Sequence, residues 1–264
     1  MYTKYTSEAT GLTGEVGGFI REARLADVPE DVRHLAKRSI LDGLGLAVAG
    51  SQSAAGRIAR EAIASYRSQN VESSVLGTTM RLPGRFAAFA NGLAMHADDY
   101  DDTQLAIAQD RVYGLLTHPT APVLPAALAL AERDDRSGSD LLLWYLIGVE
   151  VETKVAEAIN PRHYDEGFHS TATMGAIGAG AAVARALELD ARRTAVTLAI
   201  AASQAAVLRE NFGSMTKPFH AGRAAESGVF AGELAARGFT AASKKFRAPN
   251  NEDPPSHTQT APVI

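Results

Sequence analysis

The chain has 264 residues, of which 46% are hydrophobic, and its formal net charge is −4. This length suffices for one large domain or two small ones. The sequence contains no cysteine, which excludes disulfides, thiolate nucleophiles and Cys-ligated metals. No run of like charge is long enough to bind nucleic acid or an anionic membrane surface. The longest apolar run, residues 141–149, is far shorter than the ~20 residues that cross a bilayer. The first residues lack the apolar stretch of a signal peptide, so we expect a cytoplasmic protein.

Apolar residues recur at three- and four-residue spacing through most of the chain, which predicts an all-α, multi-helix bundle. The predicted helices cover residues 29–50, 53–69, 82–96, 120–133, 139–159, 171–189, 191–208 and 218–237. Residues 71–77 are β-rich and predict either a short strand or an extended link. Gly175, Gly178 and Gly180 would weaken an exposed helix, so we expect the helix over 171–189 where neighbouring backbones approach closely.

The last segment differs in composition from the rest. Residues 243–264 contain several prolines and show no apolar periodicity, which predicts disorder. The expected organisation is one helical domain, residues 1–242, followed by a disordered tail, residues 243–264.

An acidic run follows the predicted helix that ends near His96. Asp98, Asp99, Asp101 and Asp102 lie within five positions, next to the negative pole of that helix. The simplest interpretation is a solvated acidic turn. The apolar, small-residue helix before the run and His118-Pro after it favour burial instead. Buried carboxylates would require hydrogen bonds or a cation.

The same run permits a second interpretation. Residues 98–102 match the DDxxD pattern with which helical isoprenoid synthases bind Mg²⁺ and a diphosphate, and carboxylate oxygens suit Mg²⁺. Such enzymes need an aromatic-rich cavity, whereas aromatic residues make up only 6% of this chain, and no second acidic motif is present. A Mg-dependent diphosphate enzyme stays an alternative.

Three further residues lie where loops lead into helices. His169 directly precedes a Gly/Ala-rich helix, whose positive pole favours a neutral imidazole that can accept a proton or donate a hydrogen bond; a simple capping role is the alternative. His118 has a similar location. Lys217 precedes Pro218 and is expected in an extended loop, where its ammonium and free backbone N–H groups attract carboxylates. Taken alone, it is an ordinary surface lysine.

Other polar residues are expected to support a pocket or the core. His220 and Arg223 are three residues apart on one helix face, where they would line or brace the same pocket. Glu150 and Glu152 lie in a strongly apolar helix, and we expect one of them to be paired internally, with Lys154 or Arg162 as candidate partners.

Five segments together resemble the MmgE/PrpD family over roughly the first 240 residues: 40–50, 91–103, 118–122, 167–171 and 215–225. The family includes 2-methylcitrate dehydratases, cis-aconitate decarboxylases and an iminodisuccinate epimerase. The resemblance implies a lyase or dehydratase that acts on small di- or tricarboxylates without a metal or organic cofactor. It also implies a homodimer, and a pocket between the helical domain and a smaller α/β lid.

Mapped onto this sequence, the family's site positions are Asp99, Thr103, His118, His169 and Lys217. Lys217 and His118 suit the negative charge that develops on a substrate carboxylate when a neighbouring proton leaves. His169 is expected to move protons, Asp99 to orient a neighbouring cation or histidine, and Thr103 to hydrogen-bond a hydroxyl or carboxylate. 

Asp98 stands where the family more usually has an apolar residue, which leaves the details of the pocket open. Family members are also longer, and the change of composition at residue 243 resembles a truncation or a shifted reading frame. We therefore expect this chain to have little or no activity by itself, because without a lid water is not excluded. A non-catalytic, truncated helical module is the second alternative.

Overall fold

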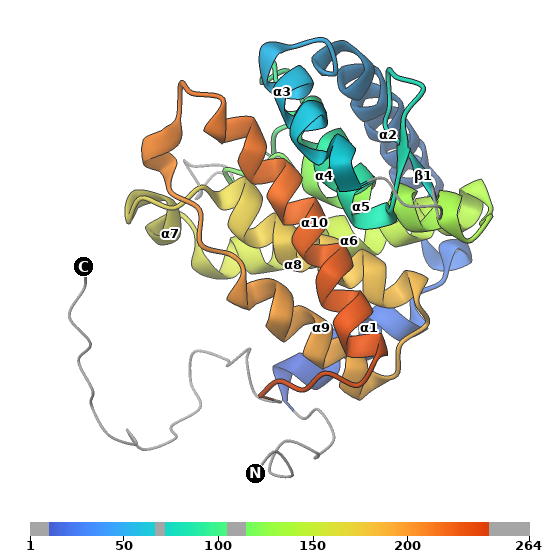
Figure 1. Ribbon diagram of the computed structural model, residues 1–264. Helices are drawn as coiled ribbons and strands as arrows, with labels where there is room; N and C mark the ends of the chain where they lie inside the picture. The colour runs from blue at the N-terminus through green and yellow to red at the C-terminus, as the bar shows by residue number, and fades with distance from the viewer. Residues whose placement is uncertain (1–10, 67–71, 105–114, 243–264) are drawn as a thin grey trace.

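The computed structural model describes residues 11–66, 72–104 and 115–242, and its fold is all-α, as the periodicity predicts (Figure 1). The α-helices in chain order are α1 Leu12–Glu22, α2 Glu30–Gly50, α3 Ala54–Ile63, α4 Gly84–Met95, α5 Thr120–Arg133, α6 Gly138–Ile159, α7 Arg162–Asp165, α8 Ser170–Ala186, α9 Ala191–Ser203 and α10 Thr216–Ala236. A two-stranded antiparallel ribbon, β1 Ser73–Ser74 and β2 Arg81–Leu82, precedes α4 and pairs Ser73 with Leu82. The predicted tail lies outside the described residues.

Helix α8 is the centre of the domain and is buried from Ser170 to Ala184. It packs against α5, α6, α9 and α10, and Figure 1 shows α10 crossing in front of it. A Cβ atom placed on Gly178 would lie 2.7 Å from the carbonyl oxygen of Gly148 on α6. The expectation that small residues let backbones approach closely at α8 is therefore confirmed.

A second close crossing, between α4 and α10, places the site. A Cβ atom on Gly222 would lie 2.5 Å from the carbonyl oxygen of Phe89, so neither helix can carry a larger side chain there without moving apart. The crossing brings the C-terminal end of α4 beside the N-terminal half of α10. His96, which caps α4, and Lys217, in the first turn of α10, therefore lie near each other.

Three local predictions need correction. Helix α1 was not predicted from its glycine-rich sequence, and it forms because Ile20 is fully buried on the domain. Helix α9 ends at Ser203 rather than at 208, since the following residues turn to pair with the segment before α8: the Arg209 N–H donates to the Gly167 carbonyl at 2.8 Å. Lys217 lies in the first turn of α10, not in an extended loop, because Pro218 is tolerated in a first turn.

Within the three described ranges, no helix combines the length and the apolar character needed to cross a bilayer.

Candidate active site

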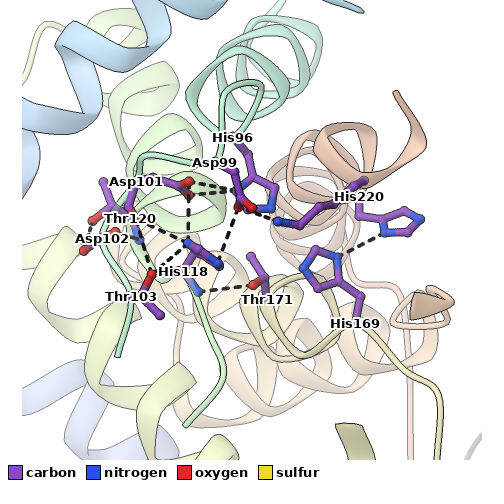
Figure 2. Close-up of polar contacts among 11 residues, drawn as sticks. His96, Asp99, Asp101, Asp102, Thr103, His118, Thr120, His169, Thr171 and His220 are labelled. Atoms are coloured by element: carbon purple, nitrogen blue, oxygen red, sulfur yellow. Dashed lines mark hydrogen bonds and ion pairs between the residues drawn. The ribbon is translucent and has the colours of Figure 1, made fainter. Parts of the chain in front are cut away.

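Asp99, Thr103, His118 and His169 lie close together (Figure 2), and Lys217 pairs with Asp99. Asp99 and Thr103 lie in the loop after α4, His118 precedes α5, His169 caps α8, and Lys217 begins α10.

Lys217 and Asp99 form the ion pair that joins α10 to the acidic loop. Burial opposes ionisation of Asp99, but the hydrogen bond and charge of Lys217 outweigh it and hold the pKa of the carboxyl below its usual value. Asp99 adopts φ 59°, a left-handed conformation that non-glycine residues rarely take and that asparagine and aspartate tolerate best. The ammonium of Lys217 also lies 5.1 Å from the centre of the Phe212 ring. Backbone conformation and ion pair together fix the position of one cation at the site.

His118 is held at three points. Its backbone N–H donates to Thr171 Oγ1 at 3.1 Å, its Nδ1 lies 3.3 Å from Thr103 Oγ1, and its Nε2 lies 3.7 Å from Asp99 Oδ1. Burial lowers the pKa of His118, and the carboxylate of Asp101 partly offsets that effect. His118 is thus a neutral imidazole beside a fixed Lys–Asp pair.

His169 is 2% exposed, and its backbone is fixed by a hydrogen bond from its N–H to the Val207 carbonyl at 3.0 Å. The Phe212 ring stands edge-on to the imidazole, with the ring centres 4.8 Å apart. Burial, reinforced by neighbouring histidines and Lys217, lowers the pKa of His169 to about 2. Burial is the largest cause of this shift, and the low pKa makes His169 a neutral imidazole and a weak base.

His96 and Asp101 form a buried pair that the sequence reasoning did not assign to the site. His96 Nδ1 lies 2.8 Å from Asp101 Oδ2, and the two side chains are 0% and 1% exposed. A carboxylate only accepts hydrogen bonds, so Nδ1 carries the hydrogen, while Nε2 is buried and has no partner among the described residues. The ring lies between His118 and His169, at centre-to-centre distances of 4.8 and 5.7 Å. The signal available in the sequence was that His96 begins the acidic run.

Asp102 points away from the histidines, into the start of α5. Its carboxylate accepts hydrogen bonds from the Thr120 hydroxyl at 2.7 Å and from the Thr120 N–H at 3.3 Å. Burial raises the pKa of Asp102 to about 6, although these hydrogen bonds oppose the shift. The Thr120 hydroxyl also lies 2.6 Å from the hydroxyl of Tyr145 on α6.

Glu152 is fully buried, and neither of its carboxyl oxygens has a hydrogen-bond partner among the residues described. Burial, with a smaller contribution from Asp102, raises its pKa well above the usual value, so the group is a neutral acid. The expected internal pairing is therefore wrong for both glutamates: Lys154 pairs with Glu157 instead, and Glu150 is exposed. A neutral carboxylic acid does not need a cation.

The acidic run does not form one diphosphate-binding face: Asp101 is buried and Asp102 half-buried, whereas Asp98 and Asp99 are exposed. Asp99, Asp101 and Asp102 turn to three different partners from an irregular loop. One atom each from His96, Asp99, Asp101 and His118 lie within 4.8 Å of one another, close enough to surround a metal ion. Because Lys217 and the His96 N–H already engage these carboxylates, a metal ion would have to displace both. The donor set therefore fits a protein cation better than Mg²⁺.

The rim of the site exposes apolar side chains: Tyr100 is 81% exposed, Met215 53% and Phe219 40%. Two hollows elsewhere, one lined by Arg21 and Arg185 and the other by Arg33 and His34, contain none of the site residues. Among the described residues, the site therefore has a polar centre and a border of exposed apolar side chains.

The fold is an all-α domain in which histidines, aspartates and a lysine converge at helix ends. A model of the MmgE/PrpD N-terminal domain matches residues 15–251, and the chain belongs to that family. Cis-aconitate decarboxylase of Homo sapiens is 36% identical over 225 residues, which cover 83% of this chain and 45% of the human protein. The mouse protein of that name is 33% identical over 233 residues, 86% of this chain and 46% of its own length.

Cis-aconitate decarboxylase of Aspergillus terreus is 28% identical over 264 residues, 93% of this chain and 52% of the fungal protein. The chain therefore spans about half the length of the curated relatives it matches.

Proposed function

We propose that this domain is the helical half of a cofactor-independent lyase for small tricarboxylates. The observation that carries the proposal is the arrangement of Lys217, Asp99 and His118 beside the neutral His169. It combines one fixed cation with neutral imidazoles that can donate hydrogen bonds to a carboxylate and, at His169, exchange a proton with the substrate.

The proposed division of labour follows from the charges. Lys217 and His118 meet the substrate carboxylate on which negative charge develops, and Thr103 hydrogen-bonds a second oxygen of the substrate. His169 transfers the proton at the reacting carbon. Asp99 holds Lys217 in place and keeps the site from carrying an unpaired cation before substrate arrives.

The named relatives favour decarboxylation as the reaction. Loss of CO₂ from a cis-aconitate-like acid leaves an electron pair on carbon, conjugated with the double bond, and His169 then delivers a proton to that allylic system. Dehydration of 2-methylcitrate is the second candidate, because removing a proton beside a carboxylate requires the same charge stabilisation.

The proposed site is completed by a second half-domain. The relatives are about twice the length matched here, and the exposed apolar rim around Lys217 is suited to burial against another domain. Excluding water would strengthen every electrostatic interaction at the site. The proposal keeps the expectation of a cytoplasmic homodimer and of little turnover by this chain alone; a non-catalytic helical module is the competing interpretation.

The test is a product assay with isotopically labelled cis-aconitate and with 2-methylcitrate. The chain alone is compared with a fusion to the C-terminal half of the human relative, and CO₂ release and the organic products are measured. The proposal predicts CO₂ from cis-aconitate for the fusion, with a loss of at least 100-fold in His169→Gln and Lys217→Ala fusions. A folded fusion that dehydrates only 2-methylcitrate supports the second candidate, and one that converts neither acid supports the non-catalytic module.

A further inference from the structure

His169 has a partner that the proposed chemistry does not use. Its Nδ1 lies 3.1 Å from Nδ1 of His220, which stands on the second turn of α10 (Figure 2). Both residues are almost completely buried, at 2% and 3% exposure. The contact therefore joins the N-cap of α8 to α10 through two imidazole rings.

The chemistry of imidazole restricts what this contact can be. A neutral ring carries one hydrogen, on either nitrogen, and its other nitrogen only accepts. Two Nδ1 atoms at 3.1 Å need a single hydrogen between them, since two hydrogens would clash and two lone pairs would repel. His169 and His220 must therefore be complementary tautomers: one carries its hydrogen on Nδ1, and the other on Nε2.

The surroundings oppose charge on the pair. His96 from the end of α4, His118 from the segment before α5 and Lys217 from α10 all disfavour protonation of His169, and burial adds to their effect. Burial and His96 likewise lower the pKa of His220. Among the described residues, no carboxylate forms an ion pair with either ring. The pair is thus held neutral, with one shared hydrogen.

We propose that His220 is the proton partner of His169 and sets which form of Nε2 His169 presents to substrate. This inference rests on the proposed function, in which Nε2 of His169 transfers the proton. When His169 carries the shared hydrogen, its Nε2 has a lone pair and is a base. When His220 carries it, His169 holds its hydrogen on Nε2 and is an acid.

A balanced proton transfer starts from the first form, in the reaction that removes a proton beside a carboxylate. A substrate C–H bond breaks, its proton joins Nε2 of His169, and the electron pair stays on the substrate carbon, stabilised by the neighbouring carboxylate. The shared hydrogen then crosses to Nδ1 of His220. His169 is neutral again and His220 carries the positive charge until the transfer reverses. His220 acts through His169 and is a positioning residue.

The experiment reads the tautomers directly in the chain as it exists. Two-bond ¹H–¹⁵N spectra of protein labelled at its histidines are recorded at pH 7.5, with the two rings assigned from His169→Gln and His220→Asn variants. The proposal predicts two neutral rings, one with its hydrogen on Nδ1 and the other on Nε2. It also predicts that His220→Phe, which removes the partner nitrogen, moves the His169 signals, whereas His34→Gln on exposed α2 does not.

Two rings of the same tautomer, or a charged ring at pH 7.5, would overturn the proposal. So would a His220→Phe variant, shown to be folded by circular dichroism, that leaves the His169 signals unchanged. This experiment needs no substrate, so its outcome is separate from the activity assay. If the tautomers are complementary but the fusion converts neither acid, the hydrogen-bonded pair is supported and the proposed function is contradicted.

Discussion

The loop side and the helix side of the site handle charge in opposite ways. The loop between α4 and α5 provides a separate hydrogen-bonding partner for each of three carboxylates, those of Asp99, Asp101 and Asp102. On α8 and α10, burial lowers the pKa values of His169 and His220, and Lys217 adds to this effect at His169. Lys217 on α10 crosses between the two sides.

The difference shows how the fold assigns chemistry to position. A flexible connection can turn each carboxylate towards a separate partner, which a regular helix could not do for residues so close in sequence. Helix N-termini instead hold imidazoles and a lysine, at positions that favour anions. In the proposed function, the loop side supplies charge and the helix side transfers the proton.

On the helix side, the expected effect is a loss of stability at low pH. The folded-state pKa of His169, about 2, lies below the usual histidine value of 6.5. Its contribution to stability is therefore present above pH 6.5 and is lost as the pH falls from 6.5 towards 2. Each pH unit below 6.5 should cost up to about 1.4 kcal/mol from this residue. Urea unfolding from pH 7 to 5 should show a shallower slope for His169→Gln, with His34→Gln as control. Parallel slopes for wild type and His169→Gln would show that the residue is protonated in the fold.

On the loop side, breaking the His96–Asp101 pair should be the most damaging change. Asp101→Ala leaves both ring nitrogens of a fully buried histidine without a partner and should lower the free energy of unfolding by about 3 kcal/mol. Asp98→Ala, an exposed neighbour, should change it by less than about 0.5 kcal/mol. Equal effects in urea unfolding would mean that Asp101 acts as a solvated charge.

Asp102 should give a pH dependence of the opposite sign to His169. Its folded-state pKa of about 6 lies above the usual aspartate value of 3.8. Its contribution to stability is therefore present below pH 3.8 and is lost as the pH rises towards 6. Between pH 4 and 6, the wild type should lose about 2 kcal/mol of stability through Asp102, and Asp102→Asn should not show this loss. The variant is compared with Asp98→Asn by unfolding across that range, and an unchanged profile in Asp102→Asn would contradict the assignment.

The smallest effect separates the backbone of Asp99 from its charge. Asparagine tolerates φ 59° and alanine does not, so Asp99→Ala should be less stable than Asp99→Asn by about 1 kcal/mol, although both lose the ion pair with Lys217. Asp99→Gly should recover the difference. Thermal unfolding of the three variants checks this prediction. Identical midpoints would show that the left-handed backbone conformation has no free-energy cost for alanine at this position.

The sequence predicts most of the helices because their apolar spacing is regular; the bounds of α5, residues 120–133, match the prediction. It does not predict α1, whose glycines disfavour a helix until Ile20 packs on the domain, or the early end of α9, which depends on pairing with Gly167. These outcomes depend on contacts between distant segments.

The candidate site shows the same division. The segments carrying Asp99, His118, His169 and Lys217 were identifiable from the resemblance. The structure brings the first three together, and Lys217 pairs with Asp99. The partners of these residues were not identifiable. That His220 would face His169, 51 positions away, depends on the angle at which α10 crosses α8. The neutral state of Glu152 depends on complete burial, which an apolar neighbourhood in sequence does not establish.

The most direct test of the central claim is calorimetric titration of tricarballylate, a stable tricarboxylate, into the chain in the presence of EDTA. The account predicts binding that persists with EDTA and weakens at least tenfold in Lys217→Ala, while Lys154→Ala, an exposed lysine on α6, binds as wild type does. Binding that disappears with EDTA, or that Lys217→Ala leaves unchanged, would contradict a metal-free site built around Lys217.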